Sequence, residues 1–403
     1  MKTLWCSLLF SLSALCFAAQ DSADFATDWR QQVSQQAQWQ QYFSRSEQLL
    51  QQDRQLLQAE LKQLGQSRAT KAAKHKHFGF KTQPDPAFWL SAAAEPTALA
   101  ILSFQTPSGG WSKRTDMASQ NRRPGQQFGV EKDYIPTFDN GATSTQILWL
   151  HSYLSYARSE LKPVLQRAIE RAIRFVLEAQ YPNGGFAQTY PLRGGYHDAV
   201  TLNDDVMLNL LKLLQQVATA TDFDYLPVAV RQQAGKQFQR GLDWLLQAQV
   251  KLNGDLTVWG AQHDPVSFLP VKARAYELAS LVSSESAGIT LLLMQQPEPT
   301  AAQIASIEAA VRWFKAKQIR DTQMQRSEDG VRFVHKTGAK PLWARFYDLQ
   351  QQQPLFVDRN GKVVSSMDKL SIERQMGYGW YQSNPEAVLK AYPGWKAKLT
   401  AKQ

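Results

Sequence analysis

The chain has 403 residues, of which 43% are hydrophobic, and its formal net charge at pH 7 is +10. This length allows one large domain or two modest ones, with enough apolar residues for a sizeable core. The positive charge is spread without a long run of Lys or Arg, and no nucleic-acid recognition motif accompanies it. The charge therefore either serves solubility alone or predicts an acidic partner such as an acidic polysaccharide.

The first 19 residues have the pattern of a secretory signal peptide. An apolar run from Leu4 to Phe17 is followed by the small residues Ala18 and Ala19. The run is too short and wrongly flanked for a membrane span. We therefore expect export to the periplasm or the medium, without stable membrane insertion. Both cysteines, Cys6 and Cys16, lie in this segment, so the mature chain cannot form a disulfide bond.

Residues 20–80 form the next predicted unit, a Gln-rich helical extension. Leucines recur at helical spacing between Asp28 and about Gln66, which predicts one or two amphipathic helices. We expect a structural role for this extension. The larger domain is predicted to cover residues 81–403.

A repeated loop motif then sets the rhythm of the chain. The loop QTPSGGW begins at Gln105, QYPNGGF begins at Gln180, and a divergent third copy begins near Gln249. Each copy follows a predicted helix. Pro107 and Pro182 end that helix in the first two copies, where the Gly pairs allow backbone conformations that other residues resist. The period of roughly 70 residues leaves room for two helices per unit. Three such hairpins predict an all-α fold, an (α/α) toroid.

Further helices and a few strands complete the expected architecture. Apolar spacing predicts helices at Val206–Val217, Gly288–Met294 and Ile304–Phe314. Beyond Gln325 the pattern changes to short extended segments separated by glycines. These predict long loops and short β hairpins over one end of the toroid.

Two groups of oxygen-bearing side chains stand where helices are predicted to begin. Asp139 and Asn140 form one group, and Asp204 and Asp205 form the other. A residue of either group could simply cap its helix. Two adjacent carboxylates exceed what one cap requires, however, and Asp and Asn without Cys suit a hard cation such as Ca²⁺.

A dense mixture of charged and aromatic side chains spans residues 258–280. It contains Trp259, Gln262, His263, Asp264, Lys272, Arg274, Tyr276 and Glu277. Such a mixture indicates a lined cleft. His263 could equally be a packing histidine, and Arg274 and Glu277 could be a surface ion pair of little energetic value. Arg345 and Arg359 in later loops suit a polyanionic ligand, because arginine binds carboxylates bidentately.

These segments resemble the pectate lyases of polysaccharide lyase family 10. The matching motifs are GGWSK, DNGATSTQ, QYPNGGFAQTYPLRGGYHD, LNDDVM, WGAQHD, KARAYELASL and ARFYDL with FVDRNGK. The resemblance implies a toroidal catalytic domain at 81–403, with the Gln-rich helices outside it. It also implies calcium-dependent β-elimination of α-1,4-linked polygalacturonate to 4,5-unsaturated oligogalacturonides.

The resemblance further implies roles for individual residues. Arg274 matches the catalytic arginine, whereas residue chemistry alone favours His263 or Lys272 as the base, since arginine normally stays protonated. We expect neighbouring cations, packed together with a calcium ion, to lower the pKa of Arg274. The implied calcium ligands are Asp139, Asn140 and either Asp204 or Asp205, and the implied substrate-binding residues are Lys113, Trp259, His263, Arg345 and Arg359.

Two other functions share part of this pattern. A terpene-cyclase-like toroid also uses Gln-Gly-aromatic loops, but it requires an Asp-x-Asp-Asp motif and an apolar cavity, and the sequence indicates neither. A non-catalytic binder of acidic polysaccharide would use the basic loops without needing Asp139 and Asp204. No linker or repeated surface patch indicates an oligomer, so we expect a monomer.

Overall fold

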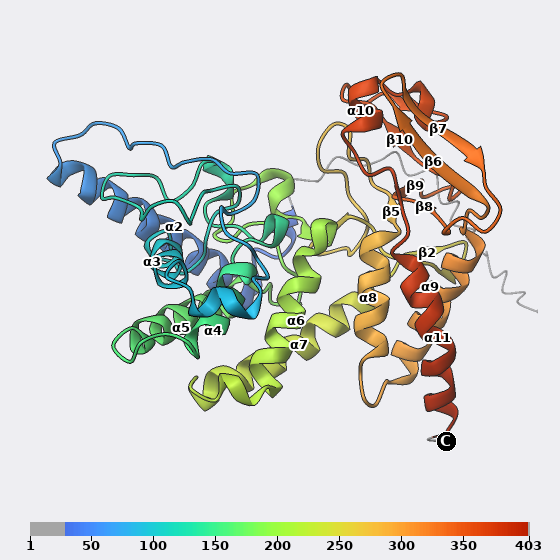
Figure 1. Cartoon of the computed structure of the whole chain (residues 1–403). Coiled ribbons are helices and arrows are strands. Elements are labelled where there is room, and N and C mark those ends of the chain that lie inside the picture. The colour runs from blue at the N-terminus through green and yellow to red at the C-terminus, as the bar shows by residue number, and fades with distance from the viewer. Residues whose placement is uncertain (1–28, 402–403) are drawn as a thin grey trace, which may run out of the picture.

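The computed structural model describes residues 29–401, and the predicted signal peptide lies outside them. Helices dominate the chain (Figure 1). Their bounds are α1 Trp29–Gln32, α2 Ala37–Gln63, α3 Ala94–Ser103, α4 Ser144–Leu154, α5 Lys162–Ala179, α6 Val206–Thr219, α7 Val228–Ala248, α8 Ser284–Met294, α9 Ala301–Ala316, α10 Ile372–Met376 and α11 Pro385–Thr400. Within the described residues, no helix has the length and apolarity needed to cross a bilayer.

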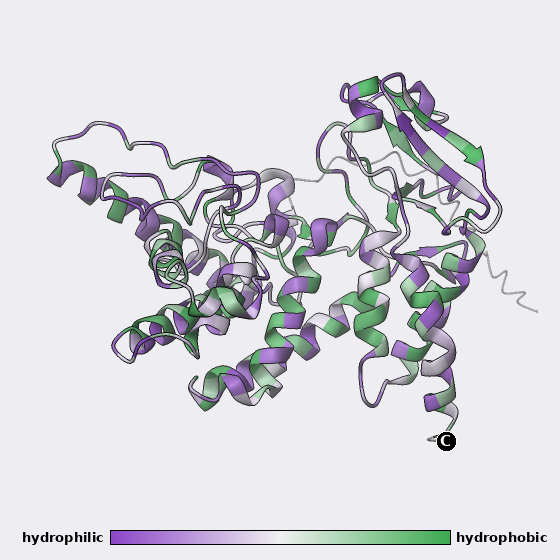
Figure 2. Cartoon of the chain, in the orientation of Figure 1, coloured by the Kyte–Doolittle hydropathy of each residue, from purple (hydrophilic) through white to green (hydrophobic). Residues whose placement is uncertain are grey.

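Three successive helical hairpins, α4–α5, α6–α7 and α8–α9, build the toroid. The first helices pack in the order α4, α6, α8 and the second helices in the order α5, α7, α9, while α11 packs on α8 and α9. Apolar residues recur along the hairpin helices, seen as green bands between purple ones in Figure 2. In α5 the buried apolar face includes Leu165, Ile169, Ile173 and Val176. The predicted all-α toroid of helical hairpins is confirmed.

The repeated Gln loops fasten each hairpin to the one before it. In every copy the Gln side chain is buried, and its Nε2 donates one hydrogen bond within its own loop and one to the second helix of the next hairpin. The acceptor carbonyls are those of Gly109 and Ala168 for Gln105, Gly184 and Gln237 for Gln180, and Thr257 and Ser306 for Gln249, at 2.8–3.1 Å. The period that the sequence displays is therefore the period of this contact.

A glycine is required at one point of the second loop. Gly184 has φ +107°, and a Cβ there would lie 2.4 Å from the backbone oxygen of Arg240 in α7. Tryptophans close the loops in a similar way, since the Nε1 atoms of Trp111 and Trp259 each donate to a carbonyl of the preceding helix at 2.7 Å. Trp343 repeats this bond with Phe314 after α9 at 2.8 Å, which extends the pattern to a further unit.

Short two-stranded antiparallel sheets cover one end of the toroid, as expected from the sequence. The pairs are β1 Val200–Thr201 with β4 Gln262–His263, β2 Lys251–Leu252 with β3 Asp255–Leu256, β5 Leu281–Val282 with β9 Phe346–Tyr347, β6 Thr322–Ser327 with β7 Gly330–His335, β8 Trp343–Ala344 with β12 Tyr381–Gln382, and β10 Phe356–Val357 with β11 Val363–Val364. The strands after residue 320 lie together above α8 and α9 in Figure 1. They enclose a small core of their own that includes Phe356 and Trp380.

The N-terminal extension packs directly on the toroid. Trp39 and Tyr42 of α2 lie with their ring centroids 5.2 and 4.9 Å from that of Tyr181 in the second Gln loop. The Asp53 carboxylate accepts from the backbone N–H and the hydroxyl of Ser108 in the first loop, both at 2.7 Å. The extension thus shares one hydrophobic core with the hairpins, and the domain boundary near residue 80 stays a prediction.

Candidate active site

The two predicted groups of cation ligands meet where α4 and α6 begin. Short 3₁₀ turns at Asp139–Gly141 and Asn203–Asp205 contact each other there. Asn140, Asp204 and Asp205 have φ values of 53°, 54° and 58°, a left-handed conformation that costs free energy at a non-glycine residue. Neither α4 nor α6 receives a side-chain cap from these groups, so the capping alternative does not explain them.

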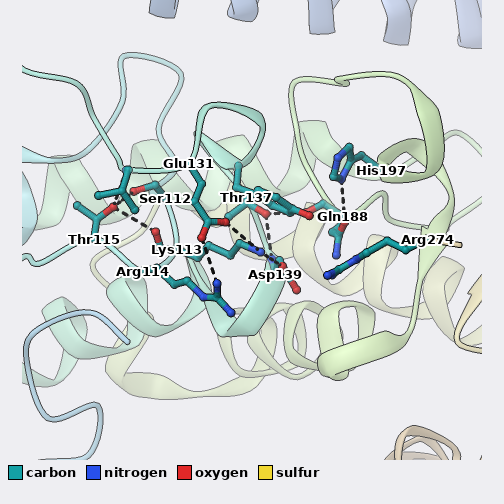
Figure 3. A network of polar contacts seen from close by, with 12 residues as sticks. Ser112, Lys113, Arg114, Thr115, Glu131, Thr137, Asp139, Gln188, His197 and Arg274 are labelled. Atoms are coloured by element: carbon teal, nitrogen blue, oxygen red, sulfur yellow. Dashed lines mark hydrogen bonds and ion pairs between the residues drawn. The ribbon is translucent and has the colours of Figure 1, made fainter. Parts of the chain in front are cut away.

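Asp139 forms a buried ion pair that Figure 3 shows at close range. Its Oδ2 lies 2.5 Å from the Nζ of Lys113, and both side chains are at most 5% exposed. The same Nζ lies 3.5 Å from Glu131 and 3.4 Å from the ring centroid of Tyr134. The Oδ1 of Asp139 is buried and has no hydrogen-bond partner within residues 29–401. One oxygen of this carboxylate is therefore available to a cation.

Arg345 joins the second acidic group to a residue that sequence reasoning missed. Its Nη2 lies 3.0 Å from the Oδ1 of Asn203 and 3.4 Å from carboxylate oxygens of both Asp204 and Glu285. Glu285 is buried at the start of α8, and its Oε2 has no hydrogen-bond partner in the described chain. In the sequence, an acid in the first turn of a helix indicates only a favourable contact with the helix dipole.

The pKa values of Asp204 and Asp205 are both raised, because neighbouring carboxylates and burial disfavour their charged forms. Limited access to water raises the pKa of Asp204, and the negative charge of Asp139 raises it further. Burial, followed by the charge of Glu285, raises the pKa of Asp205 to about 6. Carboxylates placed this close together favour a cation between them.

Arg274 approaches the same cleft from a turn, with its guanidinium pointing toward Asp139 and Gln188 in Figure 3. Its Nε lies 3.2 Å from Glu277, and its Nη1 donates to the hydroxyl of Tyr276 at 3.1 Å. Burial acts to lower the pKa of Arg274, but the charge of Glu277 and the bond to Tyr276 leave it above its usual value. The nearest charge to this guanidinium is a carboxylate, so its neighbours do not lower the pKa of Arg274, and the lowering expected with a bound calcium ion stays a prediction.

Arg359 lies beside Tyr276 and is about half exposed. Its Nη2 is 2.8 Å from Glu373, and its guanidinium carbon lies 5.1 Å from the Tyr276 ring. Arg374, which sequence reasoning also missed, lies buried on the same ring at 4.8 Å and on Tyr378 at 4.0 Å. Two tyrosines thus support the arginines of the cleft through cation–π contacts.

Two predicted substrate-binding residues are instead part of the core. Trp259 and His263 are both 0% exposed. The Nε2 of His263 accepts from the N–H of Gly260 at 2.9 Å, and its Nδ1 lies 2.7 Å from the carbonyl oxygen of Phe268. Burial lowers the pKa of His263 to about 4, so the ring is neutral at pH 7. In this conformation neither side chain offers a surface or a free nitrogen to a sugar, and the packing alternative fits His263.

The donor set fits Ca²⁺ only in part. Across residues 29–401, no three His, Cys, Asp or Glu side chains converge as a complete metal site. The unpaired Oδ1 of Asp139 and the raised pKa of Asp204 nevertheless favour a cation at this point. Because Ca²⁺ takes six to eight oxygen ligands, water and the carboxylates of a bound ligand would have to supply the remainder.

Comparison with known proteins shows which family the chain resembles. Residues 105–389 match the family model described as pectic acid lyase. A family 10 polysaccharide lyase from Cellvibrio cellulosa is 34% identical, with a TM-score of 0.66 over 77% of this chain and 96% of that one. An aspartate-to-alanine mutant of a family 10 polysaccharide lyase from the same organism, in complex with trigalaturonic acid, is 33% identical over 78% of this chain and 98% of that one, also with a TM-score of 0.66. No curated protein matches the chain.

Proposed function

Since the chain belongs to the pectic acid lyase family, we propose that this polysaccharide lyase is a pectate lyase with polygalacturonate as its substrate. It would cleave α-1,4 linkages by calcium-dependent β-elimination and release 4,5-unsaturated oligogalacturonides. The observation that carries the proposal is the convergence of Arg274, Arg345 and Lys113 with Asp139 and Asp204 at one site, where the charges of Asp139, Arg345 and Lys113 all act on Asp204. The trigalaturonic acid bound by the solved mutant supports this substrate class.

The reaction explains why cations and carboxylates must meet here. The proton to be removed is on C5, next to the uronate carboxylate, and negative charge spreads onto that carboxylate in the transition state. Asp139 and Asp204 would hold Ca²⁺, whose charge would neutralise the carboxylate and stabilise this developing charge. Arg345, fixed by Asn203 and Glu285, would orient the uronate.

Arg274 is the candidate base, and its surroundings set a condition on catalysis. Glu277 and Tyr276 hold the guanidinium in its protonated form when no substrate is bound. Only the neutral form can accept the C5 proton. We therefore expect turnover to increase as the pH rises, and to depend on a ligand that draws Arg274 away from Glu277.

The competing function is non-catalytic binding of acidic polysaccharide. The two would be separated by the ultraviolet absorbance of unsaturated uronide during incubation with polygalacturonate, with calcium and with a chelator. A rise in absorbance that the chelator stops would support the lyase and its ion together. Folded protein that binds polygalacturonate without any rise would instead favour the binding function. We also propose export, on the pattern of the first 19 residues alone.

A further inference from the structure

A large cavity opens beside the catalytic cleft and is not used by the reaction described above. Its volume is about 1140 Å³, and it lies between α4, α6 and the segment at residues 77–89. This exceeds the usual range of small-molecule sites, which is roughly 300–1,000 Å³. Asn140, next to Asp139, belongs to its wall, so the cavity begins where the candidate calcium ligands end.

Two helices present their polar stripes to this cavity. Asn209, Lys212 and Gln216 of α6 line it at spacings of three and four residues, and Thr145 and Ser152 of α4 line it two turns apart. This spacing places each set on one face of its helix. From Asn209 to Gln216 the stripe is about 10 Å long at 1.5 Å per residue.

The polar groups of the α6 stripe are free to bind a ligand. Asn209, Lys212 and Gln216 make no side-chain hydrogen bond or ion pair with any residue of the described chain, although Lys212 acts electrostatically on Asp205. Lys212 and Gln216 are exposed, so water satisfies them in the absence of a ligand. A ligand that replaces this water would find amide groups and an ammonium at fixed positions.

The charge of the cavity favours an anion. Lys81 and Lys212 lie in its wall, and Asp222 is the acidic residue among the described residues that line it, 3.2 Å from His151. The Nζ of Lys81 lies 4.0 Å from Asp85, but both side chains are exposed, so this pair contributes little and leaves the ammonium accessible. Trp89 adds a partly exposed indole beside these groups. Cations, amides and an aromatic ring together are suited to a sugar acid rather than to an apolar molecule.

We propose that this cavity is a second saccharide-binding site, which takes an anionic uronide segment of the same polysaccharide as it leaves the catalytic cleft past Asn140. The proposal rests on the proposed function for the identity of the saccharide. It assigns the contacts to Lys212, Lys81 and the amides of α6. A short substrate confined to the cleft would not reach them, whereas a long chain would.

The test compares substrates of two lengths in charge-removing variants. Lys212→Gln and Lys81→Gln are each compared with Lys236→Gln, which removes an exposed charge from α7 outside the cavity. With polygalacturonate, each cavity variant should raise KM by up to about fivefold, the effect of one solvent-screened charge contact, with kcat unchanged. With trigalacturonate, KM should stay at the wild-type value. Lys236→Gln should behave as wild type with both substrates.

Other outcomes would overturn the inference in recognisable ways. If the KM values for long and short substrates rise together in Lys212→Gln, then Lys212 acts on Asp205 at the catalytic centre and not through the cavity. Unchanged KM values in both Lys212→Gln and Lys81→Gln would mean that the chain does not enter the cavity.

The proposed function can fail separately from this inference. If wild-type protein forms no unsaturated product at all, the same variants are titrated with polygalacturonate by calorimetry. Weaker binding in the two cavity variants, with wild-type binding in Lys236→Gln, would then retain the site without the lyase. Equal binding in every variant would refute it.

Discussion

Replacing Lys113 by methionine tests the electrostatics at the centre of the site. The change keeps an unbranched side chain in a buried position but removes the ammonium 2.5 Å from Asp139. Asp139 would then keep a buried carboxylate whose Oδ1 already has no hydrogen-bond partner among the described residues. Leaving one charge of a buried pair uncompensated costs about 3–5 kcal/mol. We expect about 3 kcal/mol, because part of the cost is relieved when the carboxylate takes up a proton.

Urea unfolding with a chelator and with calcium would measure both parts of this reasoning. In the chelator, Lys113→Met should lose about 3 kcal/mol of unfolding free energy. A cation that binds only the folded state adds about 2.7 kcal/mol at a free concentration of 100 times its Kd. Calcium should therefore restore most of the loss, and it should bind the variant more tightly because the competing ammonium is gone. Arg114→Met is the matched control, since Arg114 is about half exposed and its pair with Glu131 should contribute less than about 1 kcal/mol.

Two results would refute this account. If Lys113→Met unfolds like wild type in the chelator, the Asp139 carboxylate is not confined as the structure places it. If the variant is destabilised but calcium restores nothing, Asp139 does not bind the cation.

Three further predictions concern the fold and the base. Gln180→Leu should lower the unfolding free energy, measured by urea unfolding, by about 2–4 kcal/mol, because two buried carbonyls lose their donor. A loss below about 1 kcal/mol would show that the two hydrogen bonds of Gln180 do not hold the hairpins together. Burial raises the pKa of Asp53 to about 6 from 3.8, so the folded chain holds this proton more tightly than the unfolded chain, and stability falls by about 1 kcal/mol between pH 5 and pH 7. In Asp53→Asn, the unfolding free energy should differ less between pH 5 and pH 7 than in the wild type. The same difference in both proteins would show that Asp53 is not the group responsible. Arg274→Lys should reduce kcat at least about 100-fold with an unchanged melting temperature, and substantial remaining activity would exclude Arg274 as the base.

The helical rhythm could be predicted from the sequence because it is a local property. The Gln loops and the apolar spacing of segments such as Val206–Val217 depend on residues close together in the chain. The meeting of Asp139 with Asp204 was implied by the family resemblance and not by the helical pattern, and the contact between their two turns confirms that they are neighbours. Repetition in the sequence therefore predicted the fold, whereas the pairing of the two acidic groups depended on the resemblance.

Burial and long-range pairing could not be predicted in this way. His263 and Arg274 occur within one polar segment, yet the first is enclosed by the core and the second faces the cleft. Glu285 and Arg374 gain their significance from partners far away in the sequence, Arg345 for the first and Tyr276 for the second. A linear pattern shows which residue types are present, but not which of them share a neighbour.

The packing of α2 on the Gln loops decides whether the rest of the chain could fold without it. The family match begins at Gln105, yet Tyr181 and Tyr190, which lie inside the matched region, are 0% exposed and in contact with Tyr42 of α2. A segment transplanted from residue 105 onward would present these rings to water, and large aromatic side chains are among the most costly to uncover. The segment that the family model matches is therefore not a self-contained unit in this protein.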